Sequence, residues 1–172
     1  MASVVLNGSV SGSCTITAPS AAGTTTLTLP VQTGTVMVNG PAFSAWQSSN
    51  QTLSNTTFTK ITFTTEVFDT NNNFASSTFT PTVAGYYQIN GRVGANVSNT
   101  GMIVSIYKNG TENSRGNESQ PSTALAGVTV SSLVYLNGST DYVEIYGYFV
   151  TGQTTDARQV CTYFNASMVR SA

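Results

Sequence analysis

Apolar and polar residues alternate along much of the chain with a period of two, which is the pattern of strands that bury one face. The alternation is clearest over residues 58–68, 128–136 and 142–149. Shorter apolar stretches that also predict strands lie at 43–46, 79–91, 102–107 and 161–169. These strands, spaced by roughly 10 residues, predict an antiparallel sandwich or barrel. No segment has a convincing helical pattern.

Turn residues separate the expected strands. Asn109-Gly110 is a strong hairpin signal, because Asn and Gly tolerate positive φ, and Asn137-Gly138 is a second Asn-Gly turn. Thr70-Asn71-Asn72-Asn73 predicts a further turn. The polar segments 111–123 and 151–158 are expected to be loops.

The first 40 residues differ from the rest, since they contain no charged side chain and no aromatic ring. We therefore expect two parts, an N-terminal β arm over 1–40 and a head over 41–172. The arm has too little apolar mass for a core of its own, so we expect one or two small hairpins that dock on a partner. An extra sheet packed on the head and a flexible tail are the alternatives. The expected docking residues are Val4, Val5, Leu6, Ile16, Leu27, Leu29, Val36 and Val38.

Composition supports a folded β protein with an uncharged surface. Charged residues make up 8% of the chain, against about 25% in an average globular protein. Hydrophobic residues reach 40% and aromatic residues 10%, which argues against disorder. Thr, Val, Tyr and Phe favour strands, and Thr, Ser and Asn supply most of the polar surface.

The same composition excludes several classes of function. The net charge is −1, so no basic footprint for nucleic acid exists. The chain has no His, which removes Ser-His and Cys-His catalysis and almost every zinc site. The seven carboxylates are scattered, and no apolar run approaches the length of a membrane span. We expect no enzyme activity, no cofactor and no membrane insertion.

Five stretches of the head carry a resemblance to a known family. They are Ala42-Phe43-Ser44-Ala45, Phe79-(x)5-Gly85-Tyr86-Tyr87-Gln88-Ile89, Ile106-Tyr107-Lys108-Asn109-Gly110, Leu133 to Val143, and Thr162-Tyr163-Phe164-Asn165-Ala166. In this order they resemble the globular head of the complement first component's q subunit, the jelly roll shared with tumour-necrosis-factor-like proteins. Ser139-Thr140 interrupts the usual Gly-Asp pair, and Ala166 stands where Gly is common. The resemblance implies an all-β, antiparallel jelly-roll sandwich behind the extended N-terminal β arm.

The arm resembles a segment found near the start of many bacteriophage structural proteins. The matching residues are Thr15-Ile16-Thr17-Ala18-Pro19, Gly23 to Pro30, and Thr33-Gly34-Thr35-Val36. Secreted animal members of the head family usually carry collagen there, with Gly at every third position, and this chain does not. Together the two resemblances imply a phage virion surface protein, assembled in the host cytoplasm.

The resemblance also implies a homotrimer, because jelly rolls of this family form tight trimers. Tyr142, Tyr146 and Tyr148 share one face of the strand 142–149, opposite Val143 and Phe149. We predict that this tyrosine face lies towards the threefold axis, with coverage by loops of the same subunit as the alternative.

Two functions follow from these resemblances. The first is a capsid decoration or cement protein whose arm binds the major capsid protein or another virion protein. The second is the receptor-binding tip of a tail fibre, which presents loops near 70–77, 110–124 and 150–158 to a host-surface glycan. A secreted cytokine-like ligand is a weaker third, because the start of the chain lacks the features of a signal peptide.

Two further features have a functional and a plain interpretation. Some members of the family bind calcium on loops, and Glu112 and Glu118 could supply carboxylates over 111–120, but a solvated loop is favoured. Cys14 and Cys161 could join arm to head. Free thiols are favoured, because disulfides are rare in the reducing cytoplasm where a phage protein assembles.

Overall fold

The computed structural model describes residues 3–7, 11–17, 40–96, 101–120 and 126–172. The chain divides into two compact units, Met1–Gly34 and Thr35–Ala172. In the first unit, β1 (Ser3–Asn7) and β2 (Ser13–Thr17) form an antiparallel hairpin. The predicted boundary between residues 40 and 41 stays a prediction. The expected docking residues Leu27, Leu29, Val36 and Val38 lie outside the described residues.

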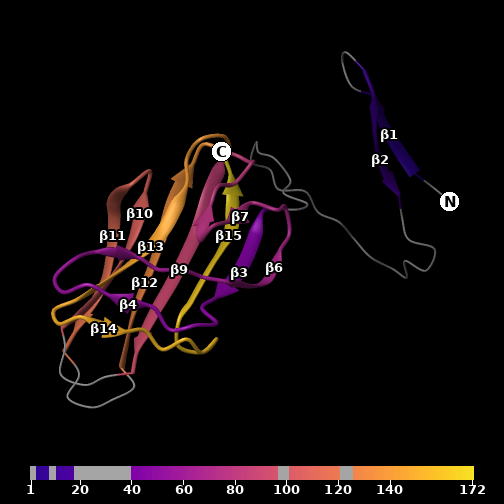
Figure 1. The fold of residues 1–172 in the computed structure, drawn as a ribbon. Helices are drawn as coiled ribbons and strands as arrows, with labels where there is room; N and C mark the ends of the chain where they lie inside the picture. Colours follow the sequence, from indigo (N-terminus) through magenta and orange to yellow (C-terminus); the bar gives the residue numbers. More distant parts are fainter. Residues whose placement is uncertain (1–2, 8–10, 18–39, 97–100, 121–125) are drawn as a thin grey trace. The chain divides into compact units, whose positions relative to one another are not determined.

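The second unit is a sandwich of two antiparallel sheets (Figure 1). The first sheet has the order β12 (Ala126–Leu136), β9 (Gly85–Ala95), β15 (Tyr163–Ser171), β3 (Ala42–Trp46) and β6 (Thr65–Asp69). The second sheet has the order β11 (Thr111–Ser119), β10 (Met102–Lys108), β13 (Val143–Phe149), β8 (Thr78–Phe79) and β7 (Phe74–Ala75), with β5 (Thr59–Lys60) paired to β13. A short pair of β4 (Thr52–Leu53) and β14 (Gln153–Thr154) completes the described strands. No helix long and apolar enough to span a bilayer occurs among the described residues.

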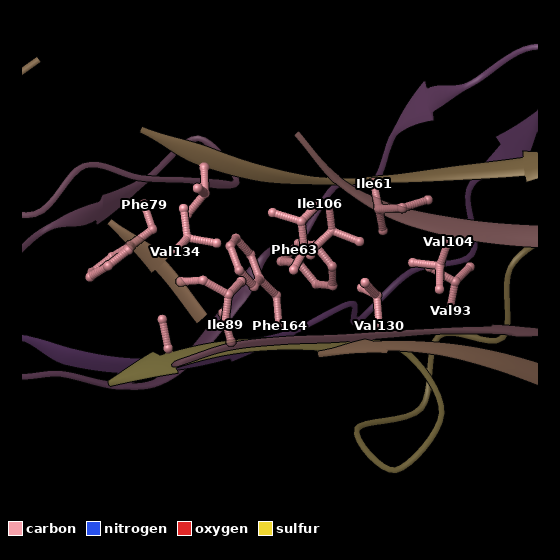
Figure 2. Close-up of a cluster of buried hydrophobic side chains, with 14 of the residues drawn as sticks. Ile61, Phe63, Phe79, Ile89, Val93, Val104, Ile106, Val130, Val134 and Phe164 are labelled. Carbon is pink, nitrogen blue, oxygen red and sulfur yellow. The ribbon is translucent and has the colours of Figure 1, made fainter. Parts of the chain in front are cut away.

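Alternating side chains fill the space between the sheets, as the period-two pattern predicts. In β9, Tyr87, Ile89 and Val93 are fully buried. In β13, Val143, Ile145 and Phe149 are fully buried, so the predicted division of that strand into two faces is confirmed. Figure 2 shows ten labelled core side chains gathered between the two layers of strands. They are Ile61, Phe63, Phe79, Ile89, Val93, Val104, Ile106, Val130, Val134 and Phe164.

Phe43 lies at the centre of an aromatic cluster in this core. Its ring stacks on Phe74 and Phe79 with centroid distances of 4.5 and 4.6 Å. Its edge contacts Phe164 at 4.8 Å. Phe43 and Phe164 belong to the first sheet, whereas Phe74 and Phe79 belong to the second, so the cluster joins the two layers.

The Asn109-Gly110 hairpin is confirmed, because both residues have positive φ and connect β10 to β11. The predicted loop over 111–123 is wrong over Thr111–Ser119, which forms strand β11. This strand is at the edge of the second sheet and most of its side chains are exposed, so its sequence shows no apolar alternation. Backbone pairing with β10 makes it a strand.

The single strand predicted over 58–68 is also wrong. Residues Thr59–Lys60 pair with β13 in the second sheet, whereas Thr65–Asp69 pair with β3 in the first. Ile61 and Phe63, between these two pieces, are buried. The chain therefore crosses from one sheet to the other here, and the alternation of buried and exposed side chains ends in the second piece, where Val67 and Phe68 are 52 and 49% exposed.

Candidate functional site

The β1–β2 hairpin exposes three apolar side chains on one face and Val5 on the other. Val4 lies opposite Ile16 in the register, and Leu6 is two residues along on the same side. Val4, Leu6 and Ile16 are 58, 57 and 53% exposed. On the other face, Val5 pairs with Thr15. An isolated two-stranded hairpin is marginally stable in water, so this amphipathic piece gains most from a partner surface.

A grid of nine side chains forms the outer face of the second sheet. The strand registers place three residues of β13, three of β10 and three of β11 in rows across this face. The rows are Glu144–Tyr107–Glu112, Tyr146–Ser105–Arg115 and Tyr148–Ile103–Glu118. The three aromatic rings therefore lie on β13 and β10, and the β11 edge carries the charged Glu112, Arg115 and Glu118, with Glu144 on β13 as the fourth charged group.

The rings of this grid pack on one another and on Phe58. Tyr107 and Tyr146 stack with a centroid distance of 4.0 Å. Phe58 contacts Tyr148 at 5.1 Å and Tyr107 at 6.0 Å. The Arg115 guanidinium lies 5.4 Å above the Phe58 ring. Other residues of the same chain thus half-cover the predicted tyrosine face.

The three predicted interface tyrosines do not form one patch. Tyr146 and Tyr148 belong to the ring cluster, whereas Tyr142 precedes β13 and donates its backbone N–H to Asn109 Oδ1 at 3.0 Å. All three are half-buried. Burial raises the pKa of Tyr146, and the neighbouring Glu144 carboxylate adds to this. Their role at a subunit interface stays a prediction.

Ion pairs fix the carboxylates around the rings. Glu144 is 8% exposed and accepts hydrogen bonds from Lys60 Nζ at 2.6 Å and the Thr78 hydroxyl at 2.9 Å. Glu112 accepts two bonds from Arg115, at 2.8 and 3.0 Å, and one from the Ser105 hydroxyl at 2.7 Å. Glu144 therefore links β13 to β5 and β8, and Glu112 links β11 to β10 through Ser105.

The residues considered for calcium lie on strand β11 rather than on a loop, which corrects that part of the prediction. Glu112 and Glu118 both contact Arg115, the latter at 3.3 Å. No group of three or more His, Cys, Asp or Glu residues that could hold a metal occurs in the described part of the chain.

Cys161 is a free, half-buried thiol. The Cys14 side chain lies outside what the structure describes, so pairing of the two cysteines stays untested.

The hydrogen bonds to Glu112 predict acid sensitivity. Arg115 and then Ser105 lower the pKa of the Glu112 carboxyl, and Asn109 with Lys108 lowers that of Asp141. A lowered pKa contributes stability that is fully present above the unfolded value, near about 4, and is lost as pH falls through the folded value. The thermal midpoint should therefore be flat from about pH 7 to 5 and fall below about pH 4. Glu112→Gln should lower the midpoint at neutral pH and reduce the acid-induced fall. Circular dichroism measures the thermal midpoint of both proteins as a function of pH. An equal acid-induced fall of the midpoint in the two proteins would contradict this role of Glu112.

The outer face of the first sheet carries a separate apolar surface. Tyr86, Leu133, Tyr135 and Val169 are 42, 55, 43 and 54% exposed. The rings of Tyr86 and Tyr135 pair across β9 and β12 with a centroid distance of 5.5 Å. The Tyr86 side of this ring pair borders a hollow of about 490 Å³. Tyr86, Leu133 and Val169 line the hollow, which extends to the C-terminal residues. We call Tyr86, Leu133, Tyr135 and Val169 the first-sheet patch.

The sequence prediction missed this patch, although one signal was available. Residues Leu133 to Leu136 are apolar at four consecutive positions, and Val134 and Leu136 are buried while Leu133 and Tyr135 are exposed. A strand that is apolar on both faces indicates a second buried surface.

No protein-family model matches the chain, and no curated protein matches it significantly. Solved structures do match. The globular domain of zebrafish complement 1qA protein aligns at TM-score 0.59 and 14% identity, over 78% of this chain and 100% of that one. Murine APRIL at pH 5.0 aligns at TM-score 0.58 and 12% identity, over 76% of this chain and 100% of that one. The Eiger TNF of S. frugiperda aligns at TM-score 0.53 and 6% identity, over 77% of this chain and 93% of that one. The predicted fold, an all-β antiparallel jelly roll of the complement-q and TNF type, is confirmed.

Proposed function

We propose that the chain is a bacteriophage capsid decoration protein, a homotrimer that docks on the particle by its N-terminal arm and carries the jelly-roll head outward. The observation that carries this proposal is the β1–β2 hairpin, a separate unit with Val4, Leu6 and Ile16 exposed together on one face. The phage-like segment that includes Ile16 supports the virion assignment.

The hairpin suits docking by strand addition. Within the described residues each of its two strands is paired along one edge only, and the other edge can accept a strand of a partner such as the major capsid protein. Backbone hydrogen bonds then supply binding, and the apolar face adds burial. The hairpin has no charged residue, so docking does not require the hairpin to remove a charged side chain from water, which would cost free energy.

Self-association of the head strengthens such docking. The first-sheet patch gives each head an apolar surface that a second and third copy can cover. Three arms held together by one trimer bind with avidity, because the second and third contacts are intramolecular. This arrangement leaves the outer face of the second sheet facing solvent.

The proposal is tested by immunogold labelling of phage particles with an antibody against residues 41–172. Gold spread over the heads is expected. Gold confined to the tail end would favour the alternative, a receptor-binding fibre tip, and particles without gold would overturn both.

Changing the hairpin face separates docking from folding. The double variant Val4→Ser with Ile16→Ser removes a cross-strand apolar pair. It should weaken binding to phage particles that lack this protein at least tenfold, which corresponds to a loss on the order of 1.4 kcal/mol or more. The neighbouring pair offers a matched control, since Val5→Ser with Thr15→Ser changes the opposite face. Cosedimentation of purified chain with particles measures both. Equal binding by the two variants would exclude this face as the docking surface.

A further inference from the structure

A hollow of about 310 Å³ opens on the second sheet at the Tyr148 end of the grid. Its lining includes Ile103, Tyr148, Val150, Glu118 and Gln120. Tyr148 and Glu118 both lie opposite Ile103 in the register, on the two strands that flank β10. Ile103 therefore forms the floor, and the ring and the carboxylate stand on either side of it, on strands about 10 Å apart.

The walls of this hollow differ in chemistry. Tyr148 and Val150 supply apolar surface on one side. Glu118 and Gln120 supply hydrogen-bond acceptors and donors on the other. A pyranose ring has the same division, with apolar C–H groups on its face and hydroxyls that both donate and accept around its rim.

Charge favours a neutral ligand over an anionic one. The cation nearest to Glu118 is Arg115, whose guanidinium is already bound by Glu112 and Glu118. No Lys or Arg occurs among the described residues that line the hollow, so a phosphate or carboxylate would meet the Glu118 carboxylate there without a balancing cation. Hydroxyl groups can instead donate to Glu118 and leave the ion pairs intact.

The hollow is held in place before any ligand arrives. Phe58 packs on Tyr148 with a centroid distance of 5.1 Å, which limits movement of the ring. Below it, Val150 N–H donates to the Gly101 carbonyl at 2.9 Å, and Met102 pairs with Phe149. A fixed site loses little conformational entropy on binding, which favours weak ligands such as single sugars.

We propose that this hollow binds one neutral hexopyranose unit, with the sugar face on Tyr148 and its hydroxyls on Glu118 and Gln120. The glycan-binding alternative placed such a site on the loops near 70–77, 110–124 and 150–158, of which the loop near 110–124 has no aromatic ring. Here β13 supplies the ring, and β11 with the residue after it supplies the polar groups. The proposal does not rest on particle docking, because all of its residues belong to the head.

The test is a titration of the full-length, isotope-labelled chain with D-glucose, D-galactose and N-acetyl-D-glucosamine, each followed by NMR. At least one sugar should shift the Ile103 methyl and the Gln120 amide. Tyr148→Ala should lower the affinity for that sugar about tenfold, whereas Tyr148→Phe keeps an aromatic ring and should keep the affinity. Glu118→Gln should lower the affinity several-fold. The control variant Glu66→Gln changes an exposed carboxylate on the first sheet and should leave the affinity unchanged.

Absence of shifts at Ile103 and Gln120 with all three sugars would overturn the proposal. Equal affinity of Tyr148→Ala and the unmodified chain would overturn it as well. Shifts at the same residues that follow protein concentration rather than sugar concentration would show a contact between copies of the chain, which also excludes the sugar site. No particles are present in this experiment, so its failure leaves arm docking unaffected.

Discussion

Phe43→Ala is expected to lower the free energy of unfolding of the head by about 3–5 kcal/mol, a large share of the 5–15 kcal/mol typical of a domain. The Phe43 side chain is fully buried and contacts rings from both sheets. Removing it takes away the stacking on Phe74 and Phe79 together with the edge contact to Phe164. The cavity lies between two sheets whose backbones are fixed by hydrogen bonds, so it can collapse only in part.

Denaturant unfolding followed by the fluorescence of Trp46, the one tryptophan of the chain, measures this loss. Phe68→Ala is the matched control, because Phe68 is also a first-sheet phenylalanine but is 49% exposed. It should cost less than about 1 kcal/mol. A Phe43→Ala protein that unfolds at nearly the same denaturant concentration as the control would show that the aromatic cluster does not join the sheets.

The fold was predictable from the sequence where a strand has one buried face and one face exposed to solvent. β9, β12 and β13 alternate strongly, and hairpin residues such as Asn109-Gly110 mark the ends of strands. β11 was not predictable by this route, because an edge strand buries little side chain and its pairing is made by the backbone. Its polar sequence, Thr111 to Ser119, is typical of a loop as much as of an edge strand.

The break within 58–68 had a different physical cause. Side-chain alternation reports which face is buried, but it does not report which sheet supplies the partner strand. Ile61 and Phe63 point into the core while the backbone leaves β13 and turns towards β3. The sequence keeps its apolar spacing through the crossing, but Val67, which continues the spacing of Ile61 and Phe63, is 52% exposed.

The candidate sites depend on registers between distant strands. The two faces of β13 followed from its own sequence, and the burial of Val143 and Ile145 confirmed them. The neighbours of Tyr148 did not follow, since Glu118 and Phe58 reach it from strands and loops far away in the chain. The first-sheet patch needed the same information, because Tyr86 and Tyr135 meet only through the pairing of β9 with β12.

Leu133→Asp is expected to convert the proposed trimer to a monomer, and Val169→Asp should have the same effect. Both side chains are more than half exposed in the single chain, so the substitutions should cost the monomer less than about 1 kcal/mol. A trimer built on the first-sheet patch would instead bury three unpaired carboxylates, each at a penalty of several kcal/mol. Light scattering should give the mass of three chains for the unmodified protein and of one chain for each variant.

Tyr148→Asp distinguishes the two faces on which a trimer has been predicted. Tyr148 lies on the second sheet, so this variant should stay trimeric if the first-sheet patch forms the contact. If Tyr148→Asp is monomeric while Leu133→Asp remains a trimer, the tyrosine face lies at the threefold axis, as the sequence analysis predicted. That result would also bury the hollow beside Tyr148, because a ring covered by a second subunit cannot stack on a sugar. A mass of one chain for the unmodified protein would exclude both arrangements and leave the arm to dock without avidity.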